Sequence, residues 1–383
     1  MSILYPVSKP VLAGRELEYV TNAIESTWIS STGKYVSAFE KHLADFVGVD
    51  EAISVCNGTA ALHLACLALG LRPGEEVIVP SLTYVSSVNA IAYCGGKPIF
   101  ADSHPDTWNM TAQTLIDALT PRTVGVMAVH LYGAPCDMPE IMEICRQRGL
   151  WLIEDCAESL GAHIGGRMTG SFGDAAIFSF YGNKTISTGE GGAVIVRDPR
   201  QRAQARLLRG QGMDPNRRYW HTVMGYNYRM TNVAAAIGCG QMEMVRYHLD
   251  ERARIAAAYA RAFAPAVARG DIALQRVPEG FVSSSWLSSC LLRALDPDDG
   301  VATQQREKLM VLLQEEHGIE TRPFFHCCHT FPMYSHSPVP QERHCDFVAS
   351  RGINLPSFSG LDEEAIFTIA QAVLASLGRC KTN

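Results

Sequence analysis

Short runs of apolar, β-branched residues alternate with longer amphipathic stretches through the first two-thirds of this 383-residue chain. Strands that alternate with helices at this spacing are joined by right-handed crossovers, so the pattern predicts an α/β fold with a large, mostly parallel sheet covered by helices on both faces. The expected helices are residues 14–26, 34–47, 60–69, 85–93, 112–118 and 138–148. The expected strands are residues 76–79, 98–101, 124–129, 151–154, 175–180 and 192–197.

The pattern changes beyond a long helical stretch that we expect at residues 232–263. The remainder contains a strand candidate at 286–292, helix candidates at 303–316 and 363–377, and a segment rich in Pro, His and Cys at 323–345. The length of the chain agrees with two domains at roughly 150 residues each. We therefore predict a large domain at residues 1–245 and a smaller α/β domain at residues 246–383.

Composition and charge exclude several functions. With 47% hydrophobic and 19% charged residues, the chain is globular rather than disordered. The formal net charge of −6 gives no reason to expect a nucleic-acid partner. Residues 52–71 and 77–96 contain no Asp, Glu, Lys or Arg, yet Asn, Gly, Pro and hydroxyl residues interrupt both stretches. They therefore predict buried strand–loop–helix units rather than membrane spans.

The twelve cysteines are scattered through apolar runs, at a density well below that of a disulfide scaffold. The first residues, MSILYPVSKP, have no signal-peptide character. We therefore expect a cytoplasmic protein whose thiols are reduced and mostly serve as small core residues.

The loops after the expected strands carry the chemistry, because ligands of open α/β sheets bind at the carboxyl ends of strands. Asn57-Gly58-Thr59 leads directly into a helix, where the glycine lets backbone N–H groups approach an anion and the helix dipole favours phosphate. The same run also suits a simple turn and helix cap. Tyr84, which follows the strand at 76–79, is placed either to stack on a planar ring or to join the core.

Asp155 and Lys184 follow two further strands. A carboxylate at the end of the apolar run LWLIED needs a cationic or N–H partner, and both a cofactor's ring nitrogen and a helix N-terminus meet that need. Lys184 is one of seven lysines and the only one between residues 98 and 307. A lysine at a strand end near an acid suits a covalent bond to a carbonyl cofactor, and a solvated loop lysine is the alternative.

A phosphate-binding loop, a carboxylate, a lysine and an aromatic face are together what a pyridoxal 5'-phosphate site requires. The chain resembles the DegT/DnrJ/StrS family of nucleotide-sugar aminotransferases, with their fold-type I, aspartate aminotransferase-like architecture, over nearly its whole length. The runs that carry the resemblance include NGTAALHLACLALGLRPGEEVIVPSLTYVSSVNAI, IEDCAESLGA, FSFYGNKTISTGEGGAVIV, LLRGQGMDPNRRYWH and GYNYRMTNVAAAIG.

The resemblance implies roles for the residues at matching positions. Lys184 matches the family's catalytic, cofactor-binding lysine, Asp155 the partner of the ring nitrogen, and Glu158 a residue near the cofactor's phenolic oxygen. Tyr84 matches the aromatic residue that stacks on the ring. The expected phosphate contacts are Gly58, Thr59, Ser179 and, contributed across a subunit interface, Asn227. A site shared in this way implies a homodimer.

The resemblance also implies the reaction. We expect pyridoxal 5'-phosphate, cycling through pyridoxamine 5'-phosphate, to carry an amino group from L-glutamate to C4 of a nucleotide sugar, GDP-4-keto-6-deoxy-D-mannose. Another GDP-, UDP- or dTDP-linked ketosugar and a catalytically idle, cofactor-binding regulator are the alternatives. The residues expected to contact substrate are Trp28, Ser30, Asn183, Arg218, Arg229, Arg322 and His329.

Two segments stand apart from this assignment. Between Arg200 and Arg229 there are seven arginines and one acid, Asp214, which suits either a diphosphate site or an exposed basic helix face. The run His326-Cys327-Cys328-His329 departs from the family pattern at its two cysteines. Adjacent ligands do not fit the spacing of zinc sites, so we expect no metal and interpret the run as a loop at the rim of the substrate pocket.

Overall fold

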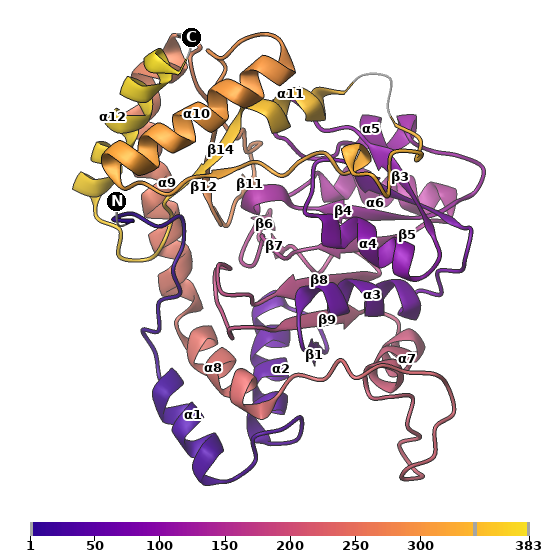
Figure 1. Ribbon diagram of the computed structural model, residues 1–383. Coiled ribbons are helices and arrows are strands. Elements are labelled where there is room, and N and C mark those ends of the chain that lie inside the picture. The colour runs from indigo at the N-terminus through magenta and orange to yellow at the C-terminus, as the bar shows by residue number, and fades with distance from the viewer. Residues whose placement is uncertain (1–2, 340–342, 381–383) are drawn as a thin grey trace.

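A seven-stranded sheet lies at the centre of the computed structural model, which describes residues 3–339 and 343–380 (Figure 1). Its strands are β1 (Ile53–Val55), β2 (Glu76–Pro80), β3 (Lys97–Ala101), β4 (Thr123–Val129), β5 (Trp151–Asp155), β8 (Ala175–Ser179) and β9 (Gly192–Val196). They lie in the order β1-β9-β8-β5-β4-β2-β3. Pairing from β8 to β3 is parallel, whereas β9 runs antiparallel to both of its neighbours. The expected large, mostly parallel sheet is confirmed.

Helices cover both faces of this sheet, because successive strand residues point to opposite sides. The helices are α1 (Glu16–Glu25), α2 (Lys34–Val47), α3 (Gly58–Ala68), α4 (Val85–Tyr93), α5 (Ala112–Asp117), α6 (Met138–Arg148), α7 (Pro199–Arg209) and α8 (Asn232–Glu243). On one face, Val77 and Ile153 share an apolar cluster with α3, α4 and α7. On the other face, Ile78 and Leu152 pack with α5 and α6, and Phe178 packs with α2 and α8.

The C-terminal part of the chain builds a second, antiparallel sheet in the order β10-β12-β14-β13. These strands are β10 (Ala273–Leu274), β12 (Ser288–Leu291), β13 (Arg322–Pro323) and β14 (Gly352–Leu355). Four helices accompany them: α9 (Val245–Ala268), α10 (Asp299–His317), α11 (His344–Arg351) and α12 (Glu363–Arg379). In a small three-stranded sheet, β6 (His163–Ile164) pairs with β11 (Phe281–Val282) on one side and with β7 (Arg167–Met168) on the other.

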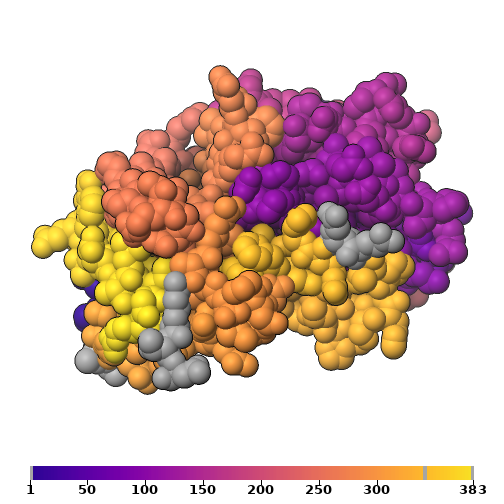
Figure 2. All heavy atoms as spheres, turned by 90° about the horizontal axis from the view of Figure 1, so that it is seen from above, coloured from indigo at the N-terminus to yellow at the C-terminus, as the bar shows by residue number. Residues whose placement is uncertain are grey.

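The C-terminal part packs directly against the large sheet. Leu82 and Tyr132, from loops of the large sheet, share one apolar cluster with Trp286, Phe324 and Cys345. Seen from above, the orange and yellow C-terminal residues form one side of the molecule and lie against its purple part (Figure 2). The cluster therefore holds the two sheets together next to the strand ends of the larger one.

The N-terminal segment also reaches the C-terminal part. Tyr5 forms a parallel bridge with Ile319, and the backbone N–H of Val7 donates to Glu320 (2.9 Å). The hydroxyl of Ser8 then donates to the backbone carbonyl of Asn183 (3.4 Å). Residues 5–8 thus connect the C-terminal part of the chain with the loop that carries Lys184.

The structure corrects one expected element. The predicted helix at 232–263 is wrong as a single element, because α8 ends at Glu243 and α9 begins at Val245. Met244 lies between them with φ −102° and ψ 7°, outside the helical range. The two uncharged stretches are the expected strand–loop–helix units, β1 with α3 and β2 with α4.

Two further features bear on the class of the protein. Within residues 3–339 and 343–380, no helix combines the length and the apolar character that a membrane crossing requires. The described residues include all twelve cysteines, and none of these forms a disulfide. Ten of them are buried, which agrees with their expected use as small core residues.

Candidate active site

A cavity of about 630 Å³ lies at the carboxyl ends of β5 and β8, beside the first turns of α3 and α4. The carboxyl ends of parallel strands meet at one edge of a sheet, which is why loops distant in sequence converge there. Eight residues predicted from the sequence line this cavity: Gly58, Thr59, Tyr84, Asp155, Glu158, Ser179, Asn183 and Lys184.

The first turn of α3 forms one end of the cavity. Asn57 caps the helix by accepting a hydrogen bond from the backbone N–H of Ala60 (2.8 Å), while Thr59 and Ser86 share a hydroxyl hydrogen bond (2.9 Å). Gly58 is so close to β8 that a Cβ there would lie 2.9 Å from Cβ of Ser179. The first N–H groups of a helix have no partner within it, so this end of the cavity attracts an anion.

Asp155 is buried at the end of β5, and the residues that follow it, 156–162, are not helical. One carboxylate oxygen accepts from the hydroxyl of Ser87 (2.7 Å), and the other accepts from the backbone N–H of Ala157 (3.0 Å). Burial raises the pKa of Asp155, while these hydrogen bonds and the charge of Lys184 oppose the rise. The helix-cap alternative is therefore wrong, and the carboxylate faces the cavity.

Lys184 and Glu158 lie opposite each other within the cavity. Lys184 Nζ is 3.8 Å from Glu158 Oε1 and 3.9 Å from the centre of the Trp286 ring. The other oxygen of Glu158 accepts from the backbone N–H of Tyr132 (2.7 Å). Burial lowers the pKa of Lys184, and burial raises the pKa of Glu158 to about 7. The two shifts bring the pKa values of the amine and the carboxyl closer together, which favours proton transfer between them.

Aromatic side chains form the walls. Tyr84, just before α4, is exposed and lines the cavity. Its ring centre is 5.5 Å from that of Phe325. Trp286 donates its indole N–H to the carbonyl of Asn183 (2.7 Å), which fixes the backbone next to Lys184. The side-chain oxygen of Asn183 is buried and has no hydrogen-bond partner among the described residues. That oxygen is an acceptor available to a ligand.

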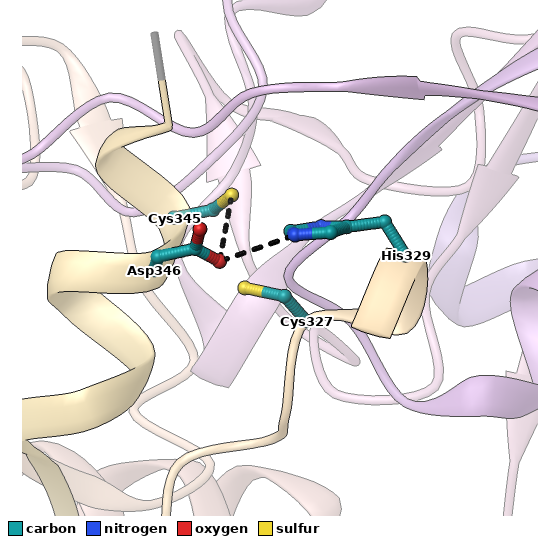
Figure 3. A group of neighbouring side chains, drawn as sticks. All are labelled: Cys327, His329, Cys345 and Asp346. Carbon is teal, nitrogen blue, oxygen red and sulfur yellow. Dashed lines mark hydrogen bonds and ion pairs between the residues drawn. The ribbon is translucent and has the colours of Figure 1, made fainter. Parts of the chain in front are cut away.

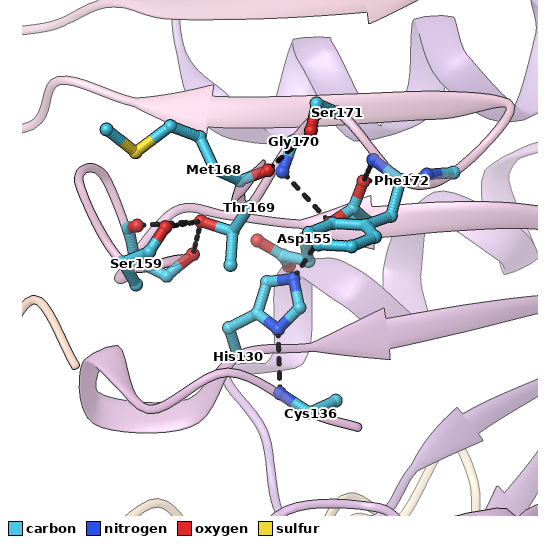
Figure 4. Close-up of polar contacts among 12 residues, drawn as sticks. His130, Cys136, Asp155, Ser159, Met168, Thr169, Gly170, Ser171 and Phe172 are labelled. Carbon is cyan, nitrogen blue, oxygen red and sulfur yellow. Dashed lines mark hydrogen bonds and ion pairs between the residues drawn. The ribbon is translucent and has the colours of Figure 1, made fainter. Parts of the chain in front are cut away.

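A polar network next to Asp155 holds the end of β5 in place (Figure 4). The carboxylate of Glu154, fully buried, accepts from three backbone N–H groups, those of Gly170 (2.9 Å), Phe172 (2.7 Å) and Gly173 (2.7 Å). It also pairs with His130 Nε2 (3.2 Å), whose Nδ1 accepts from the backbone N–H of Cys136 (3.0 Å). Because Nδ1 is an acceptor here, Nε2 carries the proton and donates to Glu154. This network positions the strand end that presents Asp155.

Seven predicted residues lie outside the cavity of the single chain: Trp28, Ser30, Arg218, Asn227, Arg229, Arg322 and His329. Trp28 and Ser30 lie just before α2. The carbonyl of Trp28 accepts a hydrogen bond from the side-chain amide of Asn232, and the carbonyl of Ser30 accepts one from its backbone N–H (2.5 Å each). Arg218 and Asn227 are exposed on the loop between α7 and α8. That loop extends away from the body of the molecule (Figure 1). Their predicted contacts with substrate or a partner subunit remain predictions.

Arg229, Arg322 and the arginines of α7 make contacts within the chain and do not line the cavity. Arg322 pairs with Glu320 (3.3 Å). Arg229 forms a backbone bridge with Val55, and its Nε is buried without a partner among the described residues. Within α7, the arginines at 202, 206 and 209 form ion pairs with acidic residues at 40, 50 and 51. These three therefore stabilise the fold rather than line the cavity.

Sequence reasoning missed several residues of the cavity. Ser87 holds Asp155, and a hydroxyl in the first turn of the helix after β2 was a visible signal for it. Trp286 and Phe325 come from the C-terminal part of the chain. No local pattern joins them to Lys184 or Tyr84, because those contacts depend on how the two sheets pack.

The burial of Glu158 predicts a pH-dependent stability. The folded protein keeps this carboxyl protonated up to about pH 7, whereas its unfolded pKa is near 4.5. The group therefore destabilises the fold progressively as pH rises between those values, and fully above them. In the cofactor-free protein, Glu158→Gln should gain thermal stability over the wild type at pH 8 and little at pH 4.5. Melting curves across this range test it, and a constant difference would contradict it.

The sequence pattern of the DegT/DnrJ/EryC1/StrS aminotransferase family matches residues 10–374. The GDP-perosamine synthase of Caulobacter vibrioides is 44% identical over 367 residues, which cover 96% of this chain and 96% of that protein. The GDP-perosamine synthase of Escherichia coli O157:H7 is 43% identical over 372 residues, covering 96% and 97% of the two chains.

Solved structures agree with these sequence relatives. The aminotransferase TlmJ from Streptoalloteichus hindustanus superposes with a TM-score of 0.89 at 30% identity, covering 98% of this chain and 99% of the other. DesI, solved in the presence of its TDP-sugar product, gives a TM-score of 0.85 at 30% identity and covers 98% and 95%. The expected fold-type I architecture is thereby confirmed.

Proposed function

Since the chain belongs to the DegT/DnrJ/EryC1/StrS aminotransferase family, we propose that it transfers an amino group from L-glutamate to C4 of GDP-4-keto-6-deoxy-D-mannose and so makes GDP-perosamine. Three GDP-perosamine synthases are 40–44% identical to it, and the alignments cover 96–97% of the chain. The observation that carries the proposal is the cavity, where Lys184 faces Glu158 and Asp155 beside the start of α3.

The residues of the cavity fit pyridoxal 5'-phosphate as the cofactor. The start of α3 supplies N–H groups for the phosphate, and the close approach of Gly58 to Ser179 leaves no room there for a side chain. Asp155 is a buried carboxylate suited to a protonated ring nitrogen, and Tyr84 presents an exposed ring for stacking. When bound, the cofactor supplies an aldehyde that carries the amino group between substrates and a ring that withdraws electrons.

The chain's own residues would bind, orient and move protons. Burial favours the neutral amine of Lys184, the form that acts as a nucleophile and then as a general base and acid. Glu158 holds the amine within 3.8 Å and takes or returns a proton near pH 7. Ser87 and Ala157 orient the carboxylate of Asp155, and Trp286 shields the amine from water. The indole N–H of Trp286 also fixes the backbone at Asn183.

The proposed functional unit is a homodimer. The loop between α7 and α8 carries exposed Tyr219, Trp220 and Met224 together with the predicted phosphate contact Asn227. Exposed apolar clusters of this kind mark interfaces, and a second chain would bring Asn227 to the cavity. Co-expressing a Lys184→Ala chain with an Asn227→Asp chain tests sharing, since mixed dimers would regain one complete site.

A single assay tests the reaction. Purified protein is incubated with L-glutamate and a panel of GDP-, UDP- and dTDP-linked ketosugars, and products are identified by mass and by NMR regiochemistry. Amination at C4 of the GDP-linked 4-keto sugar supports the proposal. If only another sugar is aminated, the proposed substrate is wrong but the proposed aminotransferase activity stands. Cofactor binding without turnover of any sugar indicates a regulator.

The close packing at the start of α3 gives a prediction for cofactor affinity. Gly58→Ala would force its new Cβ against Cβ of Ser179, at 2.9 Å, and shift the N–H groups away from the phosphate. We expect the dissociation constant for pyridoxal 5'-phosphate to rise by about tenfold or more, which corresponds to at least about 1.4 kcal/mol. Equilibrium titration measures it. Gly378→Ala in α12, where nothing lies within 4 Å, is the control and should leave the affinity unchanged.

A further inference from the structure

Four side chains of types that bind metals converge in Figure 3, and none of them lines the cavity. Cys327 and His329 come from the segment after β13, and Cys345 and Asp346 come from the first turn of α11. One ligand atom from each residue lies within 4.8 Å of the other three. Of the run His326-Cys327-Cys328-His329, only alternate members take part, so the objection based on adjacent ligands does not apply to this arrangement.

The distance between the imidazole of His329 and the carboxylate of Asp346 suits a shared ion better than a direct hydrogen bond. His329 Nε2 lies 3.4 Å from Asp346 Oδ1, and Cys345 Sγ lies 4.0 Å from the same oxygen. Direct N–H···O bonds are usually about 2.7–3.2 Å long. In tetrahedral zinc coordination, nitrogen and oxygen ligands about 2.0–2.1 Å from the ion lie roughly 3.3–3.4 Å from each other, and sulfur ligands at about 2.3 Å lie somewhat further apart.

Neighbouring residues orient the four side chains for binding a metal. The other ring nitrogen of His329, Nδ1, is 2.7 Å from the hydroxyl of Ser81, so a proton on Nδ1 leaves Nε2 free to bind a metal. Asp102 accepts the backbone N–H groups of His344 (2.9 Å) and Cys345 (2.8 Å), which fixes the first turn of α11. Cys327, His329 and Cys345 are buried, and Asp346 is half-buried.

The charges of the four ligands also balance against the ion and one neighbouring arginine. Two thiolates and a carboxylate carry three negative charges, and a divalent ion supplies two positive ones. Arg343 supplies the third, because its Nε lies 3.5 Å from Asp346 Oδ2, the oxygen that does not face His329. Without an ion, burying two thiolates beside a carboxylate would be costly, so the metal-free state keeps them as thiols.

We propose that Cys327, His329, Cys345 and Asp346 bind one structural Zn²⁺ ion. Two thiolates, an imidazole and a carboxylate are the ligand types that zinc prefers, and a closed set of four protein ligands is typical of a structural site rather than a catalytic one. The ion joins the segment that carries Phe325, part of the cavity wall beside Tyr84, to the start of α11. Zinc thereby stabilises both the C-terminal part and one wall of the active site.

Elemental analysis of the tag-free protein tests the proposal. The wild type should contain about one zinc ion per chain after gel filtration, and Cys327→Ser and Cys345→Ser should contain almost none. Cys328→Ser is the matched control. Cys328 is adjacent, equally buried, and donates its thiol to the carbonyl of Thr83 (3.4 Å) instead of joining the cluster. This control should keep its zinc.

A second measurement covers variants that fail to fold. Wild-type protein stripped of metal under reducing conditions should melt several degrees higher after one equivalent of zinc is added, because binding energy becomes folding energy. Cobalt in place of zinc should give the visible absorption of tetrahedral thiolate coordination. The proposal is overturned by wild-type protein that neither contains nor gains zinc, by a disulfide between Cys327 and Cys345 in the intact mass, or by equal zinc loss in Cys328→Ser.

Discussion

Replacing Lys184 by alanine should abolish amino transfer, with a loss of at least about 10³-fold. Among the described residues, Lys184 is the only lysine that lines the cavity, and its Nζ lies 3.8 Å from Glu158 Oε1 and against the face of Trp286. The variant would lack both the proposed nucleophile and the proposed group that moves the proton. The variant should also lose the visible absorption that pyridoxal 5'-phosphate shows when it is bound to a lysine amine. Stopped-flow assays and absorption spectra measure the two effects separately.

Lys41→Ala is the matched control for this substitution. Lys41 is exposed on α2, where it pairs with Asp45 one helical turn away, and its removal should change neither activity nor spectrum. Lys184→Ala should remain folded, because burial already disfavours the charged amine at this position. Turnover by Lys184→Ala at more than a few per cent of the wild-type rate would show that another group performs the proton transfer.

The second large effect is one on stability. Glu154→Ala should lower the free energy of unfolding by about 3–5 kcal/mol, because it leaves two buried and one partly buried backbone N–H groups and the imidazole of His130 without their acceptor. Those N–H groups belong to the loop between β7 and β8, whereas Glu154 itself lies on β5. Denaturant unfolding followed by circular dichroism measures the change.

Glu143→Ala provides the comparison for Glu154→Ala. Glu143 is a solvent-exposed glutamate on α6 that pairs with Arg146, so its removal should alter the free energy of unfolding by less than about 0.5 kcal/mol. Comparable losses in the two variants would contradict the importance given to the buried network. Loss of activity in Glu154→Ala beyond the fraction unfolded would show in addition that the network positions Asp155.

Local patterns predicted the large sheet well. The bounds of α2, α4 and α6 are those expected from the sequence, since each helix combines an apolar stripe with clear flanking loops. The break at Met244 was not predictable, because no glycine or proline marks it and the surrounding residues continue a helical pattern. The two-residue strands of the C-terminal sheet are too short to show any periodicity.

The residues of the cavity also fall into two groups, those that local sequence predicts and those that depend on packing. Asp155 and Ser179 are the last residues of β5 and β8, and Lys184 follows β8, so the rule for strand ends is enough to predict that they lie together. Trp286 and Phe325 reach the cavity only through the packing of the second sheet on the first. The proposed zinc ligands show the limit most clearly, because the sequence displays Cys327 next to Cys328, whereas the fold brings Cys327 to Cys345.

The position of β9 in the large sheet also determines when that sheet can be completed during synthesis. β1 pairs only with β9 among the described strands, and β8 separates β9 from the strands made earlier. As the chain leaves the ribosome, β1 therefore stays without a neighbour until Gly192–Val196 has been made. Pairings between distant segments form slowly and leave strand edges exposed to aggregation meanwhile. A nascent chain released before this strand emerges should therefore be prone to aggregate, and one released after it should be able to close the sheet.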